Sequence, residues 1–175
     1  MEFSLVYAVT ALILAGAAIN LVLWRHDLSA LKAMETVLFW CLLAGVGLMG
    51  LILCFESLVL PGVPLDPSGW PAGVPFRLGP ASVWLAIGLA GLACAQWRRG
   101  FWGATILISS IIFFGDAGSR LTGDLWMNNP AAVLTGPAFW YELALPVVMI
   151  ALWLGIWRGR RRRDVWLTPL ERKQS

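Results

Sequence analysis

Five long apolar runs constrain the fold of this chain more than any other feature. They cover residues 3–24, 34–60, 81–97, 101–121 and 140–157, and the third can begin nearer residue 76 and the fifth at residue 137. A helix that crosses the ~30 Å hydrocarbon core of a bilayer needs about 20 mostly apolar residues. Only 13% of the 175 residues are charged, whereas soluble domains carry about twice that share. We therefore predict an all-α membrane protein with five transmembrane helices.

The first run is expected to remain in the mature protein as a span. Only Met1 and Glu2 precede it, so the positively charged start of a secretory signal is missing. We divide the chain into an N-terminal helix with a basic cytoplasmic loop (residues 1–33), a four-helix membrane bundle (34–157) and a basic cytoplasmic tail (158–175). Residues 61–80 hold six prolines. We expect them to form an external, non-helical loop that covers the bundle as a lid.

The basic residues predict the orientation of the chain. Eleven of the thirteen Lys and Arg residues fall on one side of the membrane if the chain crosses it five times: Arg25, Lys32, Arg98, Arg99, Arg158, Arg160, Arg161, Arg162, Arg163, Arg172 and Lys173. Lys and Arg are enriched in cytoplasmic segments. We therefore predict that the N-terminus lies outside and the C-terminus in the cytoplasm.

Charged residues recur at the other end of the predicted helices. Asp116 and Glu142 each lie sixteen residues from the cytoplasmic ends of their runs, which is about 24 Å along a helix. Both therefore reach the outer leaflet, where a charge is costly unless it is paired or hydrated. We predict a polar network in which Asp116 pairs with Arg120, one helical turn away, and Glu142 or Glu56 meets Arg77 or Arg120. Its members, as a ligand-binding or a purely structural set, are Asp116, Arg120, Glu142, Tyr141, Glu56 and Arg77.

Several chemistries have no matching residues in the sequence. The single histidine, His26, lies in the first basic loop, so a bis-histidine haem is excluded. Cys41, Cys54 and Cys94 form no C-x-x-C pair and are expected to be buried as small apolar side chains. No metal-ligand cluster or phosphate-binding loop is visible. We accordingly predict no catalytic residue, no metal and no cofactor.

Two further patterns predict contacts, one with lipid headgroups and one between helices. The arginines after the fifth run are expected to contact anionic lipid headgroups, and nucleic acid is a poor alternative for so short a tail. They are Arg158, Arg160, Arg161, Arg162 and Arg163. Glycines recur in the second run, at Gly45, Gly47 and Gly50, and in the third, at Gly88 and Gly91. Such small residues let helices approach closely, either within the monomer or against a partner subunit.

Short motifs add a resemblance over about two-thirds of the chain. They are Gly69-Trp70 with Pro75-Phe76, RRGFWGAT at 98–105, FFGDA at 113–117 and NNPAAVLTGPAFWYELALP at 128–146. From about residue 37 to residue 154 the chain resembles a family of small bacterial membrane proteins of unknown function, loosely DoxX-like. The resemblance implies a four-helix bundle to which the first span is an addition. It also implies that Asp116, Tyr141 and Glu142 occupy the family's polar positions, and that Arg120 stands where members tend to have histidine.

Three functions remain open at this stage. The leading hypothesis is a non-catalytic accessory subunit of a larger inner-membrane complex, for which an energy-transducing complex is one candidate. Its partners would be membrane lipids and other subunits. The second is a binder, carrier or enzyme for a lipid-like molecule such as a quinone, which would use the outer acidic cluster. The third, an ion or proton transporter, ranks last because the inner halves of the runs offer almost no polar residues.

Overall fold

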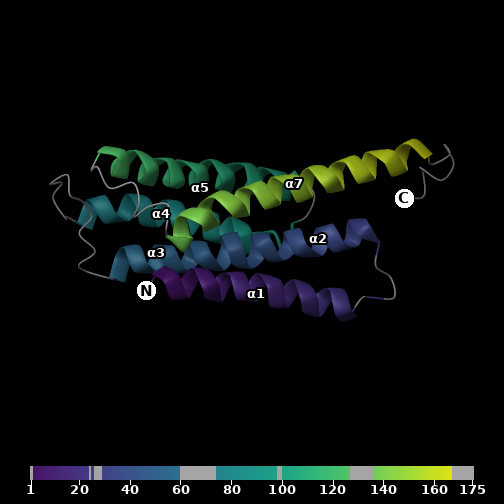
Figure 1. The fold of residues 1–175 in the computed structure, drawn as a ribbon, viewed down its shortest axis with the longest axis horizontal. Helices are drawn as coiled ribbons and strands as arrows, with labels where there is room; N and C mark the ends of the chain where they lie inside the picture. Colours follow the sequence, from purple (N-terminus) through teal and green to yellow (C-terminus); the bar gives the residue numbers. More distant parts are fainter. Residues whose placement is uncertain are drawn as a thin grey trace.

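The chain folds into an elongated bundle of helices that run roughly along one axis (Figure 1). The structure, a computed structural model, describes residues 2–23, 25, 29–59, 74–97, 100–126 and 136–166, and the regular elements in these ranges are all helical. They are α1 (Glu2–Leu23), α2 (Ala30–Trp40), η2 (Cys41–Leu48), α3 (Met49–Val59), α4 (Val74–Ala93), α5 (Gly100–Trp126) and α7 (Pro137–Trp166). Since α2, η2 and α3 form one continuous rod, the described chain makes five helices.

Four of these helices are long and apolar enough to cross a membrane. Their apolar stretches are Ser4–Leu23, Ala30–Val59, Gly100–Thr122 and Pro137–Arg161. The apolar part of α4, Leu78–Ala93, is shorter than these four. The prediction of an all-helical fold with five helices is confirmed, with four of them long and apolar enough to span a membrane. That α4 also crosses the membrane stays a prediction.

The rod that contains α2 and α3 widens in its middle. Ser29 begins it as an N-cap, because its hydroxyl accepts a hydrogen bond from the Lys32 backbone N–H at 3.3 Å. Between Cys41 and Leu48 the helix is of the π type, which is rare and recurs at functional sites. Sequence reasoning did not anticipate this segment. It places the Gly45 carbonyl where a side chain from α7 reaches it.

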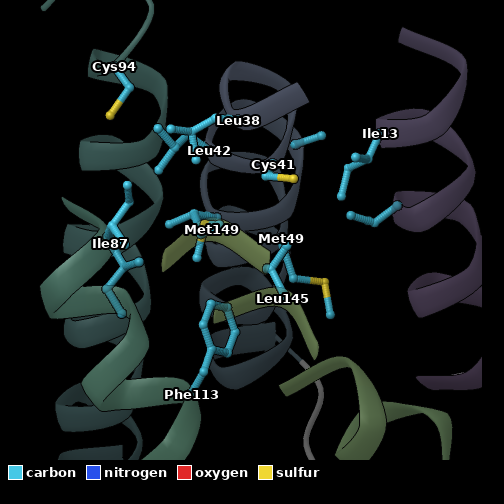
Figure 2. Packing of buried hydrophobic residues seen from close by; sticks show 14 of the residues in the cluster. Ile13, Leu38, Cys41, Leu42, Met49, Ile87, Cys94, Phe113, Leu145 and Met149 are labelled. Carbon is cyan, nitrogen blue, oxygen red and sulfur yellow. The ribbon is translucent and has the colours of Figure 1, made fainter. Parts of the chain in front are cut away.

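The apolar core runs along this rod (Figure 2). Leu38, Leu42 and Val46 are fully buried there, and Met149 from α7 packs against the same cluster. Cys41, Cys54 and Cys94 are free thiols in buried positions, which confirms that they act as small apolar side chains.

Glycines bring α4 into backbone contact with the rod. A Cβ atom added to Gly50 would lie 2.8 Å from Cα of Gly88, and one added to Gly91 would lie 2.6 Å from Cα of Gly47. No side chain fits at such distances, so Gly50 and Gly91 accept only glycine without a shift of the helices. These glycines therefore pack inside the monomer and not against a partner subunit, the two alternatives that the sequence left open.

Two predicted boundaries change. Residues 61–80 were expected to be non-helical, but α4 begins at Val74 and continues through Pro80, so this prediction is wrong for residues 74–80. Pro75 lies in the first helical turn, where its missing N–H has no partner to lose. The rest of the expected lid, residues 61–73, lies outside the described residues. The helix α7 also continues to Trp166, so the first arginines of the expected tail are helical.

The first helix lies along one side of the bundle. Its buried residues, Val6, Val9, Ile13 and Ala17, recur at helical spacing and face α2, η2 and α7. Only 28% of its apolar stretch is buried, against 56% for the rod. Its other face is therefore open to the surroundings, and its first turns help to close the hollow described next.

Candidate functional site

A cavity of about 270 Å³ lies at the end of the bundle where α1 and α7 begin and α3 and α5 end. Its apolar walls include Met49 and Leu53 from the rod, Trp84 from α4 and Phe113 from α5. Its polar lining consists of Glu56, Asp116, Ser119, Arg120, Tyr141 and Glu142. Five of the six residues of the predicted polar network thus line one cavity. The sixth, Arg77, has its side chain outside the described part of the chain.

One ion pair joins two walls of the cavity. The Arg120 guanidinium lies 3.2 Å from a carboxylate oxygen of Glu142, and the side chains are 44% and 11% exposed. The pair joins α5 to α7. The predicted ion pair between Asp116 and Arg120 is not formed, because the arginine side chain extends across to α7 instead of along its own helix. The alternative partner for Glu142 named from the sequence, Arg120, is the one observed.

Two carboxylates of the cavity stand apart from this pair. Among the described residues, neither Glu56 nor the Asp116 side chain makes a hydrogen bond or an ion pair, although the charge of Arg120 still acts on Asp116. The Ser119 hydroxyl is also engaged, since it donates to the Asp116 backbone carbonyl at 2.8 Å. The described lining therefore carries three carboxylates and one guanidinium.

Tyr141 fixes one wall of the cavity. Its hydroxyl donates a 3.0 Å hydrogen bond to the Gly45 carbonyl in the π-helical segment, and its ring packs edge-on against Phe113 with centroids 6.2 Å apart. The sequence suggested that this hydroxyl donates near Glu142, but it could not identify a backbone carbonyl as the partner. Sequence reasoning missed this contact of Gly45, and it did not name Ser119 and Trp84 among the residues that line the cavity.

A second, larger hollow adjoins the first. It is an apolar groove of about 530 Å³ between α1 and α7, with the rod behind it. Residues that line it include Tyr7, Leu14, Trp140, Ala144 and Val148. Val6 and Tyr141 line both the groove and the cavity, so these two side chains form the partition between them. Nothing in the sequence pattern indicated this groove, because its walls come from helices far apart in the chain.

The opposite end of the bundle carries the basic residues. Arg160 pairs with Glu35 at 2.6 Å, and the Arg161 guanidinium lies 4.5 Å from the centre of the Trp157 ring. Arg158 is exposed, whereas the side chains of Arg162 and Arg163 lie outside the described residues. The contact of these arginines with lipid headgroups stays a prediction. The structure places the start of α2 and the end of α7 together, away from the cavity (Figure 1).

Metal binding finds no support in the described ranges, where no three His, Cys, Asp or Glu side chains are arranged to hold an ion.

The comparison with known families gives one result. The profile of a family of unknown function, DUF6790, matches residues 1–163. No curated protein and no solved structure matches the chain. The predicted relationship to a family of unknown function is confirmed, but the profile includes the first helix, so the expectation that this helix is an addition to the family is wrong. The DoxX-like character stays a prediction.

Proposed function

Because the chain belongs to a family of unknown function, DUF6790, we propose a function from the geometry alone: it binds a lipid-like amphiphile within the membrane. The polar head of the ligand would occupy the cavity and its apolar tail the groove. The observation that carries this proposal is that the two hollows adjoin, since Val6 and Tyr141 line both of them.

The chemistry of the two hollows supports this division. Small-molecule sites are concave, mostly apolar and fitted with a few converging polar groups. The cavity supplies the polar groups, and the groove supplies an apolar surface bounded by Leu14, Ala144 and Val148. Since the groove is formed by two membrane-length helices, its outer side faces lipid. A ligand would reach it from the bilayer without crossing water.

The orientation forms part of the proposal. We place the chain in a bacterial inner membrane with the basic end in the cytoplasm, as the positive-inside rule directs. The cavity then opens toward the outer leaflet. Reporter tags should place Met1 outside and Ser175 in the cytoplasm. The opposite pair of locations would reverse this placement, and recovery of both tags in one compartment would exclude an odd number of crossings.

Photolabelling tests the binding proposal. Three probes share one twelve-carbon chain with a diazirine and differ in their heads, which are cationic, neutral and anionic. The purified protein in dodecyl maltoside should be labelled saturably by at least one of them, within residues 5–14 and 137–148. Val6→Trp and Ala144→Trp should raise the apparent Kd about tenfold, because they fill space that methylene groups of the ligand would occupy.

A control variant separates binding from surface adsorption. Val147 lies on α7 beside the groove residues but is 56% exposed and does not line the groove. Val147→Trp should therefore leave labelling unchanged. If no probe labels saturably, or if Val6→Trp and Val147→Trp behave alike, the amphiphile-binding proposal fails.

A second function, that of an accessory subunit in a larger membrane complex, has one supporting observation. On α5, Gly115 and Gly118 have nothing within 4 Å of an added Cβ, and Leu107, Ile111 and Phe114 on the same helix are exposed. Small residues on an open face let a second helix approach. Mild purification through a tag on this chain should then recover stoichiometric partners. Recovery of the lone chain would argue against this role.

A further inference from the structure

We infer that the head of the ligand is an organic cation of the ammonium type. This inference rests on the proposed amphiphile binding and names its substrate class. It follows from three properties of the cavity: its charge, the state of its hydrogen-bond donors and its aromatic lining.

The described lining of the cavity carries more carboxylates than guanidinium groups. Arg120 forms its ion pair with Glu142 and acts on Asp116 only through its charge, and among the described residues neither Asp116 nor Glu56 forms an ion pair. A carboxylate at membrane depth is costly unless a partner or water compensates it. A cationic head between α3 and α5 would supply that partner. An anionic head would add repulsion to a site that already carries excess negative charge.

The two hydroxyl donors of the cavity are in use. The Tyr141 hydroxyl donates to Gly45, and the Ser119 hydroxyl donates to the Asp116 backbone carbonyl. The ionised side chains of Glu56 and Asp116 can only accept hydrogen bonds. These two carboxylates therefore favour a head that donates or carries positive charge.

Aromatic rings complete the match. Trp84, Phe113 and Tyr141 all line the cavity. The ring centroids of Trp84 and Phe113 are 6.0 Å apart, and those of Phe113 and Tyr141 are 6.2 Å apart. Aromatic rings attract cations through their quadrupoles, and sites for quaternary ammonium groups are built from them. Carboxylates and aromatic rings that line one cavity are the recognition chemistry of an alkylammonium head.

The three photolabelling probes test whether the cavity prefers a cationic head, provided that their heads are matched in shape. The cationic head is trimethylammonium, the neutral head is its uncharged 3,3-dimethylbutyl counterpart, and the anionic head is a sulfonate. The apparent Kd of the trimethylammonium probe should be about tenfold lower than that of the neutral one, as expected for a cation held by desolvated aromatic rings and carboxylates. Glu56→Gln and Asp116→Asn should raise it about tenfold and leave the neutral probe within about twofold.

Glu35→Gln is the matched control, since Glu35 is a carboxylate at the far end of the bundle. It should change neither Kd. Equal affinity for the cationic and neutral probes, or unchanged binding in both cavity variants, would overturn the inference while leaving amphiphile binding intact. If a cavity variant does not fold, the affinities of the cationic and neutral probes for the unaltered protein still test the inference. Absence of any saturable labelling would remove both proposals.

Discussion

Replacing Gly91 by leucine should lower the apparent unfolding midpoint of the protein by about 10 °C or more. Even a Cβ atom at this position would lie 2.6 Å from Cα of Gly47 and 2.7 Å from the Leu42 carbonyl oxygen. Both are backbone atoms of the rod, so no side chain can rotate away to make room. The leucine must push α4 from the rod, which costs about 3 kcal/mol when overpacking is at its usual upper range.

The same substitution at Gly118 provides the control. A Cβ atom there meets nothing within 4 Å, and the residue is exposed on α5. Gly118→Leu should keep the midpoint within about 2 °C of the unaltered protein, because it removes a flexible residue from a helix without a clash. Thermal unfolding followed by tryptophan fluorescence measures both. Equal midpoints for the two variants would mean that α4 does not pack against the rod through glycine.

Reversing the charge of Arg120 should destabilise the protein by about 2–3 kcal/mol, and reversing Glu142 at the same time should restore most of the loss. In Arg120→Glu, the new carboxylate would lie against Glu142, whose side chain is only 11% exposed. The cost is below that of a fully buried pair because the Arg120 side chain is 44% exposed and partly screened by water. Chemical unfolding of Arg120→Glu, Glu142→Arg and the double variant measures the coupling.

The ion pair at the basic end is the matched control. Glu35 and Arg160 are closer, at 2.6 Å, but their side chains are 30% and 47% exposed. Exchanging these two charges should change the free energy of unfolding by less than about 1 kcal/mol at every step. The comparison therefore asks whether burial or distance sets the strength of an ion pair in this bundle. If the double exchange at Arg120 and Glu142 restores nothing, the two side chains do not form the pair.

Much of the fold was predictable because it depends on local properties of the chain. A run of about 20 apolar residues has few alternatives to a membrane-length helix, since its backbone polar groups must be satisfied internally. The depth of Asp116 and Glu142 followed from the rise per residue of a helix, and both line one cavity. The prolines were misleading at residues 74–80. Pro75 lies in the first turn of α4, where proline costs little, and the helix continues through Pro80.

The parts that the sequence did not predict depend on contacts between distant segments. The partner of Arg120 could not be chosen from the sequence, because i, i+4 spacing favours Asp116, whereas tertiary packing brings Glu142 within reach. The hydrogen bond from Tyr141 to Gly45 spans 96 residues. It also needs a carbonyl in the π-helical segment, for which residue type gives no clear signal. The groove likewise exists only once α1 and α7 have docked on the rod.

A crystal structure with a brominated ligand tests the central claim most directly. The ligand is a dodecyl trimethylammonium amphiphile with bromine near the middle of its chain, and bromine is located by its anomalous scattering. The account predicts one bromine peak in the groove beside Ala144 and Val148, with the head between Asp116 and Trp84 in the cavity. Bromine peaks only on the outer faces of the helices, with the cavity closed by its own side chains, would contradict it.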